Sequence, residues 1–210
     1  MFRQRIFIPL LACMCIALAS CGTVIVDWAD FLKLEGKSYT GEWGTVVADP
    51  YIVREQIGEV KFELSTSKQK NNSKYKSKDG DAAFLPVGTR IFALKGFPGH
   101  ELVAVSDPHQ LNGYKIYRQD RTEPVRLQAK DVKEIQIYLN QNLNVFHGKH
   151  LATIRGDGIA EFIALVDQAE PYPGEFGHYP FETERADFYA AVLELESGLG
   201  ILHRISRYEG

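Results

Sequence analysis

The chain has little cysteine that a folded domain could use. Only three of its 210 residues are Cys, and two of them, Cys13 and Cys15, lie in an apolar segment at the N-terminus. A framework of disulfides is therefore not expected. A chain of this length buries about 70% of its unfolded surface, so an apolar core alone can hold it folded, even in the exported setting where disulfides are common.

The sequence also lacks an excess of basic residues. It contains 24 Lys and Arg against 27 Asp and Glu, which gives a formal charge of −3 and a pI near 6.1. Proteins that bind nucleic acid usually carry a strongly basic surface, because they must neutralise phosphates. The composition therefore predicts no nucleic-acid partner.

No hydrophobic run has the length that a transmembrane helix usually needs. The apolar segment from Ile6 to Ser20 has 15 residues and contains Pro9, whereas a spanning helix needs about 20. Arg3 and Arg5 precede this segment. A charged start followed by a short apolar stretch is typical of a signal peptide, so we expect residues 1–20 to be cleaved.

The residues at the expected cleavage point narrow this prediction. Leu18-Ala19-Ser20-Cys21-Gly22 resembles the lipobox of bacterial lipoproteins, in which the Cys sulfur receives a diacylglyceryl group and a peptidase cuts just before it. The resemblance implies a mature chain, residues 21–210, that is lipid-anchored through Cys21 on the outer face of a membrane. Two acyl chains suffice for stable attachment. The alternative is an ordinary cleaved secretory signal followed by an unrelated cysteine.

Recognisable catalytic and metal-binding motifs are missing. The sequence contains no nucleophile elbow, zincin helix, phosphate-binding loop or Ser-x-x-Lys motif. His147 and His150 are three residues apart, but Gly148 weakens a helix there and no third ligand is evident. We therefore predict no metal, no cofactor and no catalytic residue.

Pairs of carboxylates leave one enzymatic alternative open. Glu182 with Glu184, or Glu194 with Glu196, could serve as the acid and base of a hydrolase that acts on the cell wall. In a strand, residues with this spacing are more simply one solvent-facing edge. Binding rather than catalysis is the preferred interpretation.

Alternating apolar residues predict a fold dominated by antiparallel strands. The clearest strand is Glu59–Leu64, in which Val60, Phe62 and Leu64 share one face. Four more short segments bounded by turn residues suggest strands. They are residues 90–95, 101–105, 114–118 and 134–139.

The C-terminal third adds helix to this pattern. Apolar residues recur at helical spacing over residues 158–169, behind Asp157 as an N-cap. Residues 188–196 and 199–208 predict a hairpin, although residues 186–196 also suit a helix. We expect an α+β fold, mainly antiparallel sheet with one or two helices, in a single globular domain over residues 21–210. Two small lobes that meet near residues 147–153 are an alternative arrangement.

Two segments are candidate contact surfaces. Residues 65–80 could touch anionic lipid or wall polymer through five lysines, although a solvated loop explains the same composition. Residues 170–181 could bind an envelope protein or wall polymer through aromatic rings, although rings packed on the core explain it equally. The residues concerned are Lys68, Lys70, Lys74, Lys76 and Lys78, and Tyr172, Phe176, Tyr179 and Phe181.

Four stretches of sequence in the first half of the chain form a recognisable combination. They are Trp28-Ala29-Asp30-Phe31-Leu32, Ile57-Gly58-Glu59-Val60, the run from Gly80 to Thr89, and Lys95-Gly96-Phe97. This combination resembles a group of uncharacterised cell-envelope lipoproteins from Gram-positive, spore-forming bacteria. The resemblance implies an envelope location and brings no known activity.

The lipobox generates a direct prediction. We expect the mature wild-type protein to begin at Cys21, to carry the mass of a diacylglyceryl group and to partition with membranes. Cys21→Ala should lose both the mass and the partition, because the attachment sulfur is gone. Intact-mass measurement and membrane fractionation of the two proteins check this. A soluble wild type without lipid would contradict it.

Overall fold

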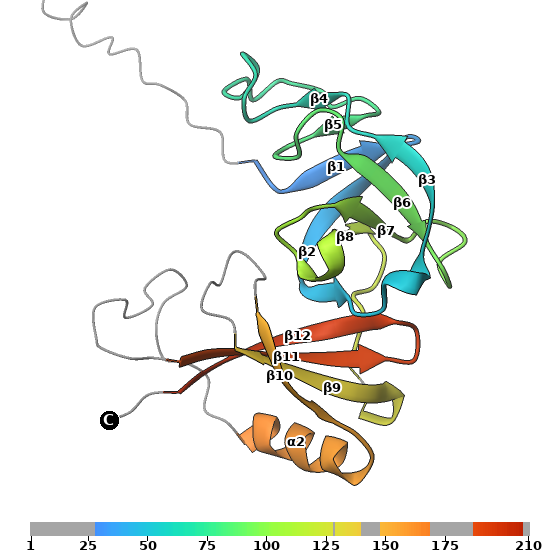
Figure 1. Cartoon of the computed structure of the whole chain (residues 1–210). Helices are drawn as coiled ribbons and strands as arrows, with labels where there is room; N and C mark the ends of the chain where they lie inside the picture. Colours follow the sequence, from blue (N-terminus) through green and yellow to red (C-terminus); the bar gives the residue numbers. More distant parts are fainter. Residues whose placement is uncertain (1–27, 128, 140–147, 169–186, 208–210) are drawn as a thin grey trace, which may run out of the picture.

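The computed structural model describes residues 28–127, 129–139, 148–168 and 187–207. Its strands join in one largely antiparallel sheet, accompanied by one α-helix (Figure 1). This confirms the expected mainly antiparallel α+β fold. The strands are β1 (Phe31–Leu34), β2 (Lys37–Val47), β3 (Val53–Glu59), β4 (Phe62–Glu63), β5 (Asp81–Ala82), β6 (Arg90–Leu94), β7 (Leu102–Ser106), β8 (Tyr114–Gln119), β9 (Val132–Leu139), β10 (Lys149–Ile154), β11 (Asp187–Leu195) and β12 (Leu199–Arg207).

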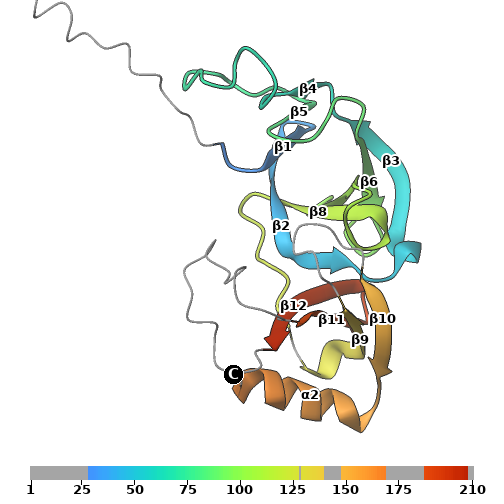
Figure 2. The same ribbon diagram turned by 60° about the vertical axis from the view of Figure 1, so that its left-hand side comes forward.

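The sheet has two regions that share strand β2. The strand order is β10-β9-β11-β12-β2-β8-β7-β6-β3, while β1 pairs with β2 and β5, and β4 pairs with β5. Strands β1 to β8 curl around one core, and β9 to β12 form a flatter layer (Figures 1 and 2). The chain passes from one region to the other between β8 and β9.

Strand β2 changes partners along its length. Its first residues, Lys37–Thr40, pair with β1, and its last, Thr45–Val47, pair with β12. The pairing of β2 with β8 shifts register between Gly41 and Val46, and such irregularities bend and twist a strand. At Gly41 a Cβ atom would lie 2.3 Å from Oδ2 of Asp30, so glycine is needed for the chain before β1 to approach.

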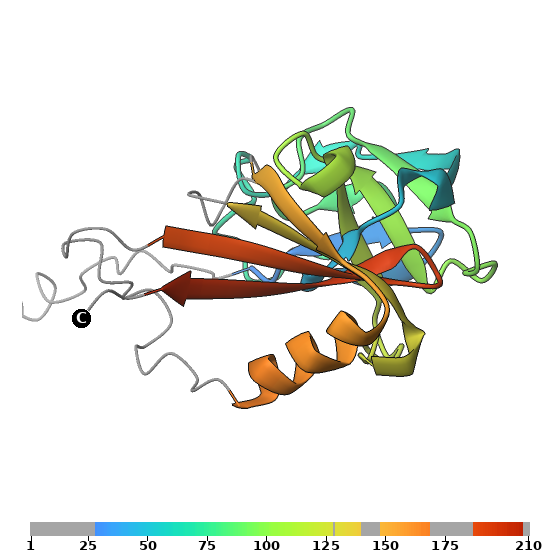
Figure 3. The same ribbon diagram turned by 60° about the horizontal axis from the view of Figure 1, so that its bottom comes forward.

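The β9–β12 layer has two apolar faces. Helix α2 (Asp157–Gln168) covers one face, where Ile159, Phe162 and Ile163 pack against a cluster that includes Ile135 and Leu193 (Figure 3). The other face meets the β1–β8 region, where Val192 packs with residues that include Val46, Ala48 and Leu111. Both faces are covered, as expected for strands rich in apolar residues.

The strand expected over residues 59–64 is interrupted. Val60 and Leu64 are fully buried, so the predicted inward face is confirmed. However, β3 ends at Glu59 against Arg90, and β4 begins at Phe62 against Asp81. The chain changes partners at this point, and the backbone N–H groups of Val60 and Lys61 bind the carbonyls of Thr89 and Gly80.

The C-terminal hairpin is confirmed, and its first arm is a strand. Residues 187–195 pair with β9 on one side and β12 on the other. These ladders outweigh the helix propensity of the Ala- and Glu-containing sequence, since propensity is only a weak preference. The helix expected over 158–169 is also confirmed and begins one residue earlier, so Asp157 lies in its first turn. Among the described helices, none has the length and apolar character to cross a membrane.

A buried ionic cluster ties the start of the fold to its centre. One oxygen of Asp30 accepts a hydrogen bond from the hydroxyl of Tyr117 at 2.6 Å, and the other lies 2.5 Å from Nζ of Lys115. Both charged side chains are only about one-tenth exposed. Lys115 also lies 4.2 Å from the centre of the Trp43 ring. Burial, with the neighbouring carboxylate, raises the pKa of Tyr117 far above its ordinary value.

This cluster generates a stability prediction. Asp30→Ala should lower the free energy of unfolding by about 3 kcal/mol, because the ammonium of Lys115 and the hydroxyl of Tyr117 lose their buried acceptor. Chemical denaturation measures the change. The matched control is Asp120→Ala, which removes an exposed carboxylate bonded to Thr40 and should cost less than about 1 kcal/mol. Equal losses in the two variants would contradict the central role of Asp30.

Candidate functional site

The lysine-rich segment, residues 65–80, forms the connection between β4 and β5. We call it the basic loop. All five of its lysines are exposed. The backbone is held by successive turns, in which the N–H groups of Ser67, Lys70, Asn72 and Tyr75 each bind the carbonyl three residues earlier. The loop is therefore a folded platform that presents its lysines to solvent.

Tyr75 anchors the basic loop to the sheet. Its ring stacks on Phe62 of β4, and its hydroxyl donates to Oδ2 of Asp81 at 2.7 Å. The same carboxylate oxygen accepts the backbone N–H of Lys78 at 2.7 Å. Burial, together with the hydrogen bond and charge of Asp81, raises the pKa of Tyr75 to about 12, so the hydroxyl stays a donor at physiological pH.

The basic loop lies beside the point where the chain enters the fold. The indole Nε1 of Trp28 donates to the backbone carbonyl of Lys70 at 2.7 Å. Farther along the loop, Asp79 accepts the backbone N–H of Gly36 from the turn after β1. Trp28 is only seven residues from Cys21, a distance that an extended chain spans in at most about 25 Å. The loop is thus within that reach of Cys21.

The loop is basic within an acidic chain. Without Arg3 and Arg5, residues 21–210 contain 22 Lys and Arg against 27 Asp and Glu, a formal charge of −5. Residues 65–80 carry five lysines and one aspartate, a charge of +4, so the remainder carries −9. Because positive and negative charge are separated in this way, a charged surface would orient the domain.

A second polar site lies where the two sheet regions meet. The turn between β11 and β12 docks on residues 48–52, where the carbonyl of Gly198 accepts the N–H groups of Ala48 and Asp49. Gly198 has a φ of +82°, and a Cβ there would lie 2.4 Å from a methyl of Ile52. Only glycine fits this contact without rearrangement.

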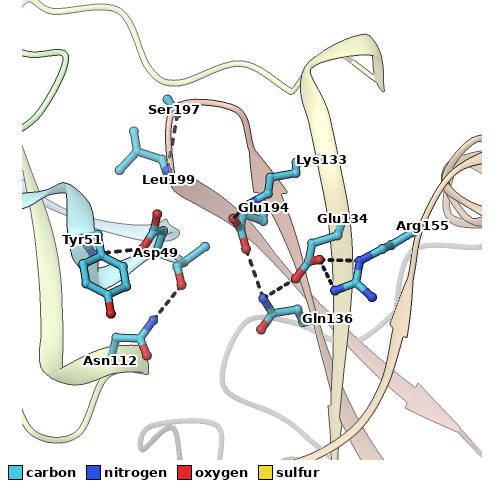
Figure 4. Close-up of polar contacts among 11 residues, drawn as sticks. Asp49, Tyr51, Asn112, Lys133, Glu134, Gln136, Arg155, Glu194, Ser197 and Leu199 are labelled. Atoms are coloured by element: carbon cyan, nitrogen blue, oxygen red, sulfur yellow. Dashed lines mark hydrogen bonds and ion pairs between the residues drawn. The ribbon is translucent and has the colours of Figure 1, made fainter.

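Beside this turn, buried carboxylates form a chain of polar contacts (Figure 4). Glu194 is 5% exposed and binds Nζ of Lys133 at 2.7 Å. Gln136 donates to both Glu194, at 3.1 Å, and Glu134, at 2.9 Å. Glu134 also binds the guanidinium of Arg155 at 2.6 Å. Glu134 and Glu194 are opposite each other on paired strands, so the cationic and amide partners offset their repulsion.

A cavity of about 300 Å³ opens beside the Lys133–Glu194 pair, at one end of this chain of contacts. Its walls include Asp49, Ile52, Lys95, Phe97, Lys133 and Glu194. The hydrogen bond and charge of Glu194 raise the pKa of Lys133, which keeps its ammonium protonated and unsuited to act as a base. Partial burial raises the pKa of Glu134, but the hydrogen bonds and charges of its partners, Arg155 above all, hold it below its ordinary value.

The structure changes the interpretation of one candidate carboxylate pair. Glu194 and Glu196 were expected to share one solvent-facing edge, and this is wrong for Glu194, which is buried while Glu196 is exposed. The register shift between Glu194 and Leu195 separates their environments. The other pair, Glu182 and Glu184, lies outside the described residues.

Several candidate contact residues are not among the residues that the structure describes. Tyr172, Phe176, Tyr179 and Phe181 all lie outside the described residues, as do Cys21 and His147. His150, the partner proposed for His147, has its Nε2 3.0 Å from the hydroxyl of Thr153. Within the described ranges, no group of three or more His, Cys, Asp or Glu side chains is arranged to hold a metal ion.

Comparison with protein-family models, with curated proteins and with solved structures gave no match to this chain. The candidate sites therefore depend on the residues themselves. Sequence analysis missed the exposed apolar residues Phe84 and Val87, which follow β5 near the basic loop. The available signal was the Phe-Leu-Pro-Val-Gly run, whose Pro and Gly indicate a turn without showing which of its apolar residues point outward.

The Glu134–Arg155 pair generates a pH prediction. The pKa of Glu134 is lower in the folded protein, so its ion pair contributes stability above the unfolded pKa of about 4.3 and loses it as the pH falls through the folded value. Arg155→Gln should therefore reduce the free energy of unfolding at pH 7 by about 1 kcal/mol, a small value because Arg155 is largely exposed.

The difference between wild type and Arg155→Gln should shrink as the pH falls below about 4. Denaturation at a series of pH values measures it. Arg126→Gln is the control, since both side chains of the Arg126–Glu123 pair are about four-fifths exposed, and it should show almost no change. A loss independent of pH in Arg155→Gln would show that packing, not charge, is involved.

Proposed function

We propose that the protein is a lipid-anchored binding module of the bacterial cell envelope, attached through Cys21, whose basic loop rests on an anionic membrane surface. The hydrogen bond between Trp28 and the carbonyl of Lys70 carries this proposal. It ties five exposed lysines to a point seven residues from the lipobox cysteine. A short tether forces this part of the domain to stay near the membrane.

Electrostatics supports the same orientation. Each lysine close to an anionic bilayer contributes up to about 1 kcal/mol, and the attraction extends over roughly one Debye length. The remainder of the mature chain, with its charge of −9, is repelled by the same surface. The domain should therefore stand on the basic loop and hold its acidic regions away from the lipid.

A partner contact is a separate part of the proposal. We propose that residues 170–181 supply it through Tyr172, Phe176, Tyr179 and Phe181, to either an envelope protein or a wall polymer. Aromatic side chains give a large contact area at a low entropic cost.

The membrane contact is tested with the mature chain carrying Cys21→Ser, so that no lipid masks weak binding. It should bind vesicles that contain anionic lipid, and less so as salt increases. Replacing Lys68, Lys70 and Lys74 with Gln should weaken binding by up to about a hundredfold, since each lysine adds about 1 kcal/mol. Co-sedimentation with vesicles measures the affinity.

The matched control replaces three exposed lysines elsewhere, Lys95, Lys130 and Lys149, with Gln. This variant has the same net charge as the basic-loop variant and should bind within about twofold of the parent. Equal weakening in both variants would show that overall charge, not the basic loop, determines binding. Unchanged binding in both variants would contradict the proposed membrane contact and show that the basic loop is only a solvated connection between β4 and β5.

A further inference from the structure

The turn that follows β5 exposes apolar side chains. Phe84 is 49% exposed and Val87 is 63% exposed, with Pro86 also at the surface. We call Phe84, Pro86 and Val87 the apolar tip. Leu85, in the middle of the same turn, is only 7% exposed and belongs to the core cluster of the β1–β8 region. Large exposed apolar groups beside a well-packed core often mark a contact surface.

The apolar tip is held in a fixed conformation. The backbone N–H and the hydroxyl of Thr89 both donate to the carbonyl of Pro86, at 3.1 and 2.6 Å. The N–H of Gly88 donates to the carbonyl of Val60 at 2.8 Å. With Leu85 anchored in the core, the exposed side chains belong to a fastened turn, so little conformational entropy is lost when they are buried against another surface.

The tip lies next to both the basic loop and the entry of the chain. Ala83, just before Phe84, donates its N–H to the carbonyl of Phe31 in β1 at 3.0 Å. Its carbonyl accepts the N–H of Ser65, the first residue of the basic loop, at 2.9 Å. The β4–β5 and β5–β6 connections lie at the end of the molecule where the chain enters β1 (Figures 1 and 2).

We propose that the apolar tip inserts into the interfacial region of the bilayer while the basic loop contacts anionic headgroups around it. This inference rests on the proposed function and deepens it, because it names the residues that enter the lipid. Apolar side chains flanked by lysines are the composition that membrane-surface segments use. The short tether from Cys21 holds the tip within reach of the lipid, which makes a bilayer the occupant of this surface rather than a second copy of the chain.

The contribution of the tip differs from that of the lipid anchor. A diacylglyceryl group retains the domain at the membrane but leaves it free to rotate. The basic loop and the adjacent apolar tip would add contacts to the one at Cys21, so that the rotation of the domain is restrained as well as its distance from the membrane. The domain would then have one face toward the lipid, and the junction between the sheet regions would face away from it.

Depth-dependent fluorescence tests the insertion in the lipidated mature protein. Lipid on Cys21 and loss of the signal peptide leave no free thiol, so Val87→Cys provides a single site for an environment-sensitive fluorophore. In vesicles that contain anionic lipid and shallow nitroxide-labelled lipid, we expect a blue-shifted emission that the nitroxide quenches. The control is Tyr51→Cys, an 86% exposed position at the sheet junction, where the label should remain in water.

Each outcome separates the two proposals. Quenching at position 87 but not at 51 supports insertion of the apolar tip. If the protein floats with vesicles while its label at position 87 stays in water, insertion of the apolar tip is wrong but the proposed membrane contact of the basic loop is retained. Equal quenching at both positions overturns a fixed orientation. A protein that does not float overturns the proposed function together with the inference that rests on it.

A second measurement depends on no label. In the mature chain with Cys21→Ser, Phe84→Ser together with Val87→Ser should weaken binding to anionic vesicles by about tenfold, from the loss of apolar burial. The salt dependence of binding should stay as in the parent, because no charge is removed, whereas the basic-loop variant, which keeps Lys76 and Lys78, should show a weaker salt dependence. Wild-type binding by the double Ser variant would overturn the inference.

Discussion

The fold depends on the partner change of strand β2. Its first half pairs with β1 and its second half with β12, while β8 runs along the other edge across a register shift. One strand thus belongs to both regions of the sheet. This requires Gly41, where the carboxylate of Asp30 occupies the place of a side chain, and Gly198, where the C-terminal turn presses on Ile52. The close approach at Gly198 holds the turn of the flat layer against the curled region, whereas the one at Gly41 lies within the curled region.

The two regions differ in where their charged side chains lie and in what those side chains bind. In the β1–β8 region, a buried cluster around Asp30 is bordered by aromatic rings, and the lysines of the basic loop lie exposed at the surface. In the β9–β12 layer, carboxylates are drawn inward and satisfied by Lys133, Gln136 and Arg155. Buried ion pairs of this kind add little net stability but are costly to break. They therefore specify how the strands pair more than they strengthen the fold.

Much of the architecture was predictable from apolar alternation. Ile135 and Ile137 in β9, like Val60 and Leu64 before β5, lie inward as their spacing indicated, because one buried face per strand requires a period of two. The interruption at residues 60–61 was not predictable, because it comes from a change of partner that only the tertiary structure determines. The same holds for residues 187–195, whose strand ladders on both sides decide against a helix.

Candidate sites were predictable where composition alone identified them. The lysines of the basic loop were recognised and are exposed, but the contact of Trp28 with the backbone of Lys70 has no sequence signature, because it joins residues 42 positions apart. Glu194 seemed an ordinary surface residue, because its burial comes from the covering of both faces of β11, which alternation in the sequence does not indicate. Phe84 and Val87 were missed because a short apolar run is indistinguishable from core until Leu85 is seen to take the inward place.

The hydrogen bond between Trp28 and Lys70 has a consequence for binding thermodynamics. In a lipid-anchored chain, it confines the lysines to a shell about 25 Å deep above the headgroups, which corresponds to an effective concentration on the order of millimolar. Contacts too weak to retain a free protein would then be occupied most of the time. Such contacts would also break and re-form quickly, so the domain would return to the same bound orientation without leaving the surface.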